Sequence, residues 1–267
     1  MVHLEPGHSN AGLLKIAGDL AERFDARVIG IVACREMQFV YGDGYIPADL
    51  IDQDRGQLKK RIKEAEFRSM LLNRVRTLEW RSGIMFTPLS EYIGSEVRSA
   101  DLVITGIGSG GILDASRFVN IGDLVMQVGR PVLIVPPAAD KLKLEQVIIA
   151  WKDTRETQRA AFDALPLLKT AAHVTVVEVS ADQELAAART HIEDVVGWLK
   201  SHGVVAESHA SPSIGDDASL LKAIAREQGA DLIVAGAYGH SRMREWVLGG
   251  VTRDLLLRAE QFALLSH

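Results

Sequence analysis

The chain has 267 residues, of which 47% are hydrophobic and 24% charged, and its formal net charge at pH 7 is −5. This composition is typical of a folded protein with a substantial core and excludes extensive disorder. The acidic balance and the lack of a long Lys/Arg run disfavour nucleic acid as a partner. No stretch approaches the roughly 18 apolar residues of a membrane span, and the N-terminus lacks a basic segment followed by a signal core. We therefore expect a cytoplasmic protein without a membrane partner.

In the first half, a strand-like run over 28–33 precedes Cys34, the single cysteine of the chain. We interpret it as a small buried thiol, because it has no partner for an intramolecular disulfide. The segment 41–47 carries turn residues and aromatics ahead of a helix-like run over 49–73. It is either a lid or partner-binding surface, or a surface insertion without structure of its own. A strand at 131–135 closes this half, and the proline-containing stretch 136–146 is the predicted linker.

The second half alternates strand-like and helix-like patterns. Strands are predicted at 147–150, 174–179, 204–208, 232–235 and 262–265. Helices are predicted at 155–169, 182–202 and 218–228. Strands that alternate with helices of this length indicate βαβ units and a parallel sheet.

The two halves repeat each other in order. Val2–Glu5 matches Ala150–Asp153, and two longer matches pair 26–32 with 172–178 and 100–106 with 230–236. The longer matches have offsets of 146 and 130, which implies 16 extra residues between 36 and 99 in the first half. We predict two tandem domains, a degenerate one over 1–137 and one with a ligand-binding motif over 146–267.

The most specific motif follows the strand at 232–235. Glycines at 236, 239 and 249 give the spacing Gly-x2-Gly-x9-Gly, and Gly250, Val251 and Thr252 follow. A buried strand that ends in glycines lets backbone N–H groups approach a phosphate, and a helix N-terminus just behind adds positive potential. The alternative is a tight turn with a close contact between helix and strand.

Together with the repeated strand–helix pattern, this motif resembles the ATP-binding signature of the universal stress protein family over essentially the whole chain. The resemblance implies an α/β fold of two tandem doubly wound parallel-sheet domains, adenine nucleotide α-hydrolase-like, arranged as an internal pseudo-dimer. It also implies ATP, with or without Mg²⁺, at the carboxyl ends of the strands of the second domain. In the family a Ser or Thr follows the third glycine, whereas this chain has Gly250, so one phosphate-facing hydroxyl is missing.

The residues that the resemblance assigns to the cofactor surround the strand ends of the second domain: Trp151, Lys152, Asp153, Val179, Gly236, Gly239, His240, Arg242, Gly249, Gly250, Val251 and Thr252. Asp153 matches the acid that meets the adenosine end, and Val179 matches the residue whose backbone borders adenine. The alternatives are that Asp153 or Thr154 caps a helix and that Lys152 and Arg242 are only solvated. No catalytic or metal-binding residue is predicted.

The first domain departs from this pattern. At the offset of 130, the residues in the loop positions are Ser109, Val119, Asn120 and Gly122. Only Gly106 is kept, and Glu5 stands for the strand-end acid. A β-branched residue at the third glycine cannot readily adopt a positive φ, so we predict a degenerate nucleotide site. The glycine-rich stretch 106–111 leaves binding of another anion open.

The sequence is compatible with three functions. We favour an ATP-binding regulatory protein of the stress response, with at most slow hydrolysis. The substitution at Gly250 keeps open an interaction protein of the same fold that binds no nucleotide. An enzyme of the adenine-nucleotide α-hydrolase type is suggested by the stretch 109–116, but that loop follows the wrong strand and is one residue too long.

Assembly is predicted from the last strand of each domain. An unpaired apolar edge strand promotes aggregation, so we expect 132–135 to pair with 262–265 within one chain. Further homodimerisation through the insertion near Tyr41 remains open, and the sequence names no protein partner.

Overall fold

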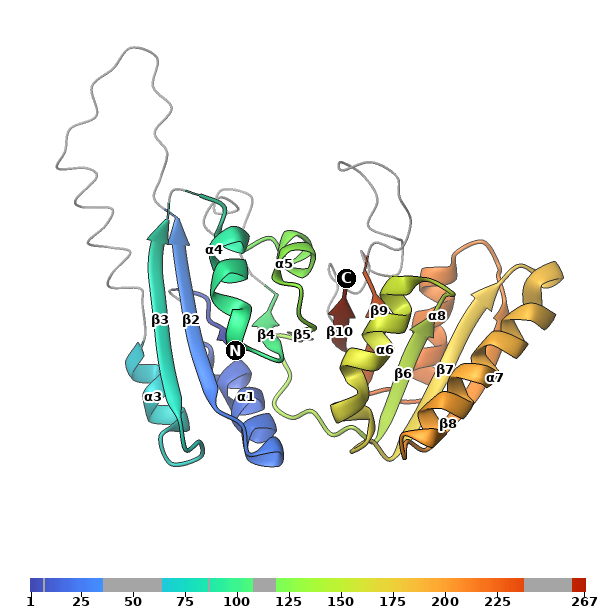
Figure 1. The fold of residues 1–267 in the computed structure, drawn as a ribbon, viewed down its shortest axis with the longest axis horizontal. Coiled ribbons are helices and arrows are strands. Elements are labelled where there is room, and N and C mark those ends of the chain that lie inside the picture. Colours follow the sequence, from blue (N-terminus) through green and yellow to red (C-terminus); the bar gives the residue numbers. More distant parts are fainter. Residues whose placement is uncertain (7, 36–63, 86, 108–118, 238–260) are drawn as a thin grey trace, which may run out of the picture. The chain divides into compact units, whose positions relative to one another are not determined.

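The computed structural model describes all residues except 7, 36–63, 86, 108–118 and 238–260. The chain forms two compact units. The first contains Met1–Val128 and Pro137–Lys141, and the second contains Gly129–Pro136 and Leu142–His267. Each unit has a mostly parallel sheet flanked by helices (Figure 1). The predicted α/β class is confirmed, while the predicted limits at 137 and 146 stay a prediction.

The first unit contains four parallel strands in the order β3-β2-β1-β4. They are β1 (Val2–His3), β2 (Val28–Arg35), β3 (Leu78–Met85) and β4 (Val103–Gly106). The helices are α1 (Ala11–Phe24), α3 (Glu64–Leu71), α4 (Leu89–Glu96), the 3-10 turn η1 (Val97–Ser99) and α5 (Ile121–Val128). Helix α1 packs against α3, and α4 packs against α5.

Strand β2 forms the centre of this core because nearly all of its side chains are apolar and buried. Gly30 lets two rings close over the strand: a Cβ there would lie 2.8 Å from Phe67 and from Trp80, whose ring centroids are 5.2 Å apart. Cys34 near the end of β2 is 1% exposed, which confirms the prediction of a buried thiol.

The second unit contains six strands in the order β5-β10-β9-β6-β7-β8. They are β5 (Val132–Val135), β6 (Gln146–Trp151), β7 (His173–Ser180), β8 (Ala206–Pro212), β9 (Leu232–Gly236) and β10 (Phe262–Ser266). The helices are α6 (Arg155–Leu168), the 3-10 turn η3 (Asp182–Glu184), α7 (Leu185–Ser201) and α8 (Asp217–Glu227). Helices α6 and α7 cover one face of this sheet and α8 the other (Figure 1).

Strand β5, from the end of the first repeat, pairs with β10 from the end of the second. This is the antiparallel pair of the sheet, with Leu133 opposite Leu264 and Ile134 opposite Ala263. All four side chains are fully buried. The predicted pairing of these two apolar strands is confirmed, and the two-fold relation between the repeats stays a prediction.

The predicted elements of the second half agree with the structure, with one shift. Strand β8 covers Ala206–Pro212 instead of 204–208, because this outer strand exposes most of its side chains and its polar residues give no apolar signal. In the first half, α3 lies within the helix-like run 49–73, whose residues 49–63 are outside the described ranges. Strand β3 and helices α1, α4 and α5 were not located from sequence. The insertion near Tyr41 also lies outside the described residues.

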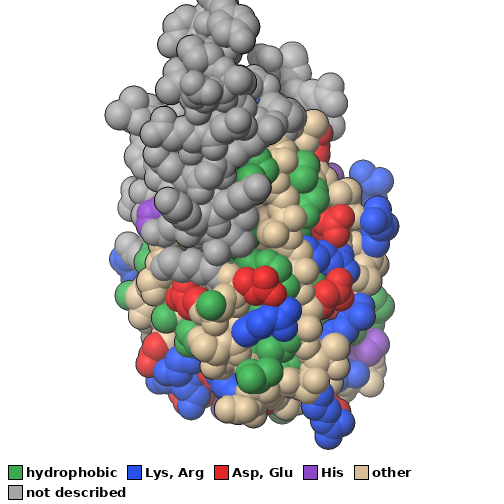
Figure 2. All heavy atoms as spheres, turned by 90° about the vertical axis from the view of Figure 1, so that its left-hand side faces the viewer, with side chains coloured by type: hydrophobic (Ala, Val, Ile, Leu, Met, Phe, Trp, Pro, Cys, Tyr) green, Lys and Arg blue, Asp and Glu red, His purple; other side chains and the backbone are tan. Residues whose placement is uncertain are grey.

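The surface of the first unit carries charges of both signs. Figure 2 shows acidic and basic side chains interspersed over the described part of this face. Several are paired: Arg74 contacts Asp19 at 2.6 Å and Glu22 at 2.7 Å, and Arg81 contacts Glu79 at 2.6 Å. Within the described ranges, no helix combines the length and the apolar character that a membrane crossing requires.

Candidate functional site

Three neighbouring parallel strands of the second unit end at one edge of the sheet. Strand β6 pairs with β7, with Trp151 opposite Glu178, and with β9, with Ala150 opposite Ala235. From β6 the chain continues through α6 to β7, which pairs with one side of β6, while β9 pairs with the other side. The direction of the strand order reverses between β6 and β9, so these two strands form a topological switch point. Ligands of open α/β sheets bind at such points, beyond the carboxyl ends of the strands. The structure thus brings 151–153, Val179 and Gly236 to the same edge.

The three predicted residues at the end of β6 have different environments. Trp151 is buried, with 7% of its surface exposed. Lys152 is exposed, and its Nζ donates to the backbone oxygen of Val179 at 3.4 Å, so it bridges the ends of β6 and β7. Asp153 is also exposed, and its Oδ1 accepts from Gln158 Nε2 at 3.3 Å.

Helix α6 begins immediately behind this edge. Thr154 is its N-cap, with Oγ1 accepting from the backbone N–H of Thr157 at 3.4 Å. Of the two caps considered from sequence, the structure therefore selects Thr154. Asp153 lies one residue before the cap, so its carboxylate is not needed to begin the helix.

Gly236, the last residue of β9, lies against the first turn of α6. A Cβ at this position would lie 2.5 Å from the backbone nitrogen of Thr157 and 2.6 Å from the carbonyl carbon of Glu156. Both neighbours are backbone atoms, so they cannot move aside as a flexible side chain would. The described part of the motif therefore supports the close helix-to-strand contact that was the alternative interpretation, and this contact brings the α6 N-terminus to the strand ends.

The remaining residues of the predicted loop lie within 238–260, outside the described residues: Gly239, His240, Arg242, Gly249, Gly250, Val251 and Thr252. Their contribution to a phosphate site stays a prediction.

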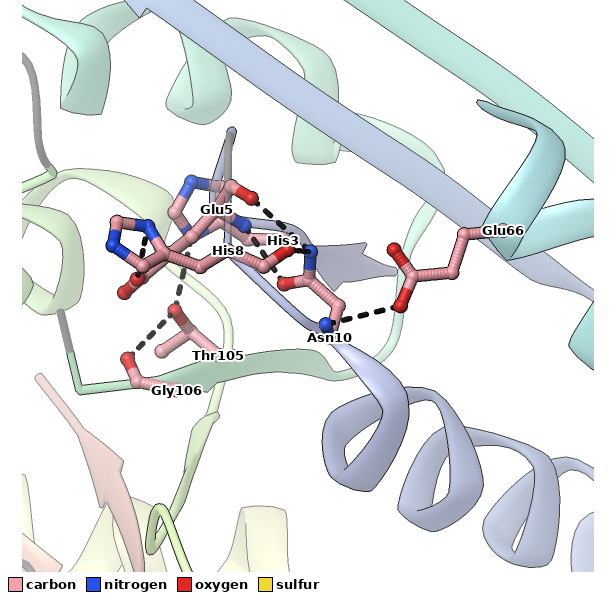
Figure 3. A network of polar contacts seen from close by, with 7 residues as sticks. All are labelled: His3, Glu5, His8, Asn10, Glu66, Thr105 and Gly106. Atoms are coloured by element: carbon pink, nitrogen blue, oxygen red, sulfur yellow. Dashed lines mark hydrogen bonds and ion pairs between the residues drawn. The ribbon is translucent and has the colours of Figure 1, made fainter. Parts of the chain in front are cut away.

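The corresponding edge of the first unit holds a polar network (Figure 3). Asn10 closes the loop after β1: its Oδ1 accepts from the backbone N–H of Glu5 at 2.9 Å, and its Nδ2 donates to the backbone oxygens of Glu5 and His8 at 3.1 and 3.2 Å. The backbone N–H of Asn10 donates to Glu66 Oε1 at 3.2 Å. This loop is therefore held in place by its own side chain.

His3 lies at the centre of this network, 4% exposed. Its Nδ1 is 3.0 Å from Thr105 Oγ1, which in turn donates to the oxygen of Gly106 at 3.2 Å. This direction leaves Thr105 as the acceptor and places the proton on Nδ1. Nε2 has no hydrogen-bond partner among the described residues. Burial lowers the pKa of His3 to about 4, so the imidazole is neutral at physiological pH.

The strand register corrects the alignment of the two repeats. Val2 pairs with Ile104 in the first unit, and the equivalent residue Val234 pairs with Ile149 in the second. Val2 therefore corresponds to Ile149 and not to Ala150, which moves Glu5 onto the position of Lys152. The prediction that Glu5 replaces the strand-end acid is wrong by one residue, because short apolar strands give no register signal of their own.

The first unit differs from the second at two further positions of the loop pattern. The oxygen Oδ1 of Asn120, which stands in the place of Gly250, accepts from the backbone N–H of Asp123 at 3.1 Å at the start of α5. A Cβ at Gly106 would meet no atom within 4 Å. The loop after β1 is longer than the loop after β6, so α1 does not approach Gly106 as α6 approaches Gly236. Both features agree with a first domain that has lost the pattern.

A cavity of about 430 Å³ lies beside Trp151 and Asp153, between α6 and α7. Its lining also includes Phe162, His191, Asp194 and Trp198. Sequence reasoning missed them. The available signal was the spacing of 191, 194 and 198, which places three side chains on one face of a helix.

Metal binding has no support in the described ranges. They contain no group of three or more His, Cys, Asp or Glu side chains placed to hold a metal ion.

These features define a class: a tandem α/β protein whose second unit has a topological switch point at its strand ends and whose first unit has a polar network at the corresponding edge. Solved structures with the same fold identify the architecture. A universal stress protein from Archaeoglobus fulgidus DSM 4304 is 16% identical, with a TM-score of 0.72 over 99% of this chain and 95% of that one. A putative universal stress protein from Pseudomonas aeruginosa UCBPP-PA14 is 16% identical, with a TM-score of 0.63 over 99% and 91%.

A functionally unknown protein from Pseudomonas aeruginosa PAO1 is 14% identical, with a TM-score of 0.60 over 99% of this chain and 91% of that one. No family model matches the sequence, and no curated protein matches it. The chain therefore has the universal stress protein fold over its whole length, and the predicted resemblance is confirmed at the level of the fold.

Proposed function

We propose that the protein is an ATP-binding regulatory protein whose second unit holds the nucleotide at the carboxyl ends of β6, β7 and β9. The observation that carries this proposal is the convergence of Asp153, the Val179 backbone and Gly236 at one topological switch point. Asp153 offers a solvent-exposed carboxylate to the ribose hydroxyls. Gly236 and the α6 N-terminus lie beside it, where a phosphate chain would meet the loop that follows β9.

The chemistry of this edge fits an adenine nucleotide. The Lys152 ammonium lies 3.4 Å from the Val179 oxygen and adds positive charge between the ends of β6 and β7. ATP bound here would stabilise the folded second unit, because a ligand that binds only the native state shifts the unfolding equilibrium. Regulation then follows from nucleotide occupancy, with no catalytic residue assigned. The site is proposed for the second unit alone, since the first unit closes its equivalent loop with Asn10.

Calorimetric titration of the full chain with ATP tests the proposal. Thr252→Ala and Asp153→Ala should each weaken binding about ten-fold or more, since a hydrogen bond to a charged group contributes roughly 1.5 to 3 kcal/mol. Glu193→Ala, an exposed carboxylate on α7, is the matched control and should bind as the wild type does. Mass spectrometry of protein denatured after mild purification should release ATP, ADP or AMP. No binding by the wild type would instead favour an interaction protein of this fold.

A further inference from the structure

The cavity between α6 and α7 results from how the two helices lie on the sheet. Helix α6 packs mainly against β9 and β10, whereas α7 packs against β7 and β8. The helices therefore diverge over β6 and leave a space of about 430 Å³ beside Trp151. This volume is sufficient for a small organic molecule.

Aromatic rings form much of the wall. Trp151 lies at the end of β6, Phe162 comes from α6 and Trp198 from α7. Phe162 is 62% exposed, which leaves a large apolar ring in water at the rim of the cavity. Trp198 is held in place by the ring of His202, with centroids 4.7 Å apart. The three rings thus line the cavity from β6, α6 and α7.

Acidic groups lie among these rings. Asp153, just before α6, and Asp194 on α7 both line the cavity. Glu178 is directly opposite Trp151 in the parallel pair, so its side chain points to the same face of the sheet as Trp151. Glu178 is 7% exposed, and its Oε2 has no partner among the described residues. Burial raises the pKa of Glu178, while His191 and Lys152 act in the opposite direction.

Trp151 adds a second buried group without a partner. Its indole Nε1 is buried and makes no hydrogen bond to any described residue. A buried donor without an acceptor costs roughly 1 to 3 kcal/mol, and a ligand oxygen that accepts from it would remove that cost. Trp151 lines the cavity, and Glu178 projects from the neighbouring strand on the same face of the sheet. A buried donor in the wall and a buried acid beside it indicate a polar ligand and not a simple gap in the packing.

We propose that this cavity binds a small organic ammonium cation that also carries a hydroxyl or carbonyl oxygen. Cations bind to the faces of Trp and Phe, and the attraction increases when the cation is desolvated. The carboxylates of Asp153 and Asp194 add the complementary charge, and the ligand oxygen accepts from Trp151. The same carboxylates repel phosphate, so this site is distinct from the phosphate end of the proposed nucleotide site, although Asp153 borders both.

Choline is a suitable probe because it combines a quaternary ammonium with a hydroxyl. Its neutral carbon analogue, 3,3-dimethylbutan-1-ol, has nearly the same shape without the charge. Titration of the full chain with choline should change tryptophan fluorescence saturably, and the neutral analogue should bind at least about ten-fold more weakly. Equal binding of the two probes, or no saturation by choline up to about 10 mM, would overturn the proposal.

Two variants locate the site. Phe162→Ala and Asp194→Asn should each weaken choline binding about three- to thirty-fold, and Phe162 is exposed enough for its truncation to leave the fold intact. Phe24→Ala, an exposed aromatic on α1, is the control and should bind choline as the wild type does. Unchanged affinity in both cavity variants would refute this location. Neither Phe162 nor Asp194 is among the residues proposed for ATP. A failure of choline binding would therefore leave the proposed ATP site untouched, and the ATP titration tests that site separately.

Discussion

Replacing Gly236 by alanine tests whether the end of β9 has to pass close to helix α6. The added Cβ would lie 2.5 Å from the Thr157 nitrogen and 2.6 Å from the Glu156 carbonyl carbon. Ordinary van der Waals contact begins near 3.4 Å, so the first turn of α6 must move by roughly 1 Å or β9 must bend. Overpacking of this kind typically costs 1 to 3 kcal/mol, and we expect Gly236→Ala to lower the free energy of unfolding by about 2 kcal/mol.

Gly106→Ala is the matched control, because Gly106 holds the equivalent position in the first repeat and a Cβ there meets nothing within 4 Å. Neither glycine has a positive φ, so alanine is compatible with the backbone at both positions. Urea unfolding measured by tryptophan fluorescence gives the comparison. The first unit contributes Trp80, and the second contributes Trp151, Trp198 and Trp246. If the two variants had the same midpoint as each other, the close approach of α6 to β9 would be refuted.

Two further predictions concern the core and the response to pH. Leu264→Lys should lower the free energy of unfolding by about 4 kcal/mol or more, because the ammonium would be placed opposite Leu133 in a fully buried strand pair. The control is Leu72→Lys, which should change the free energy of unfolding little because Leu72 is 65% exposed. Wild-type stability of the Leu264 variant in urea would contradict the β5–β10 pairing. His3 has a pKa of about 4 in the folded protein, below its value near 6.5 in the unfolded chain, so the unfolded state binds the proton first. The free energy of unfolding should therefore fall by about 3 kcal/mol in total as the pH drops from about 6.5 to 4. Urea titrations across this range should show a flatter pH dependence for His3→Gln, and an identical slope would exclude His3 as the source.

The cores of both sheets were readable from the sequence because their strands are continuous apolar runs. Leu232–Gly236 and Phe262–Ser266 agree with the predicted strands to within a residue, and both are buried. An apolar run does not mark β8, because most of its residues are exposed and polar, so its end at Pro212 was not predicted. An apolar run also does not show the register of β1, where only pairing with Ile104 shows that Glu5 corresponds to Lys152.

The candidate site likewise has features that the sequence predicted and features that only the structure shows. The motif spacing and the repeat placed Asp153 and Gly236 at the ends of two strands, because the carboxyl ends of neighbouring parallel strands meet at one edge. The sequence could not show that Gly236 touches the α6 backbone, that Thr154 is the cap, or that Lys152 reaches the Val179 oxygen.

The sequence by itself determined the α/β class, the tandem repeat and the strand edge at which we propose a ligand site, since each of these depends on local periodicity and on order along the chain. Only the tertiary structure decided which side chains from separate helices meet. Phe162 and Asp194 lie 32 positions apart in the sequence and line one cavity because α6 and α7 diverge over β6. Glu178 lies beside Trp151 because of strand register, and register depends on the packing of the whole sheet.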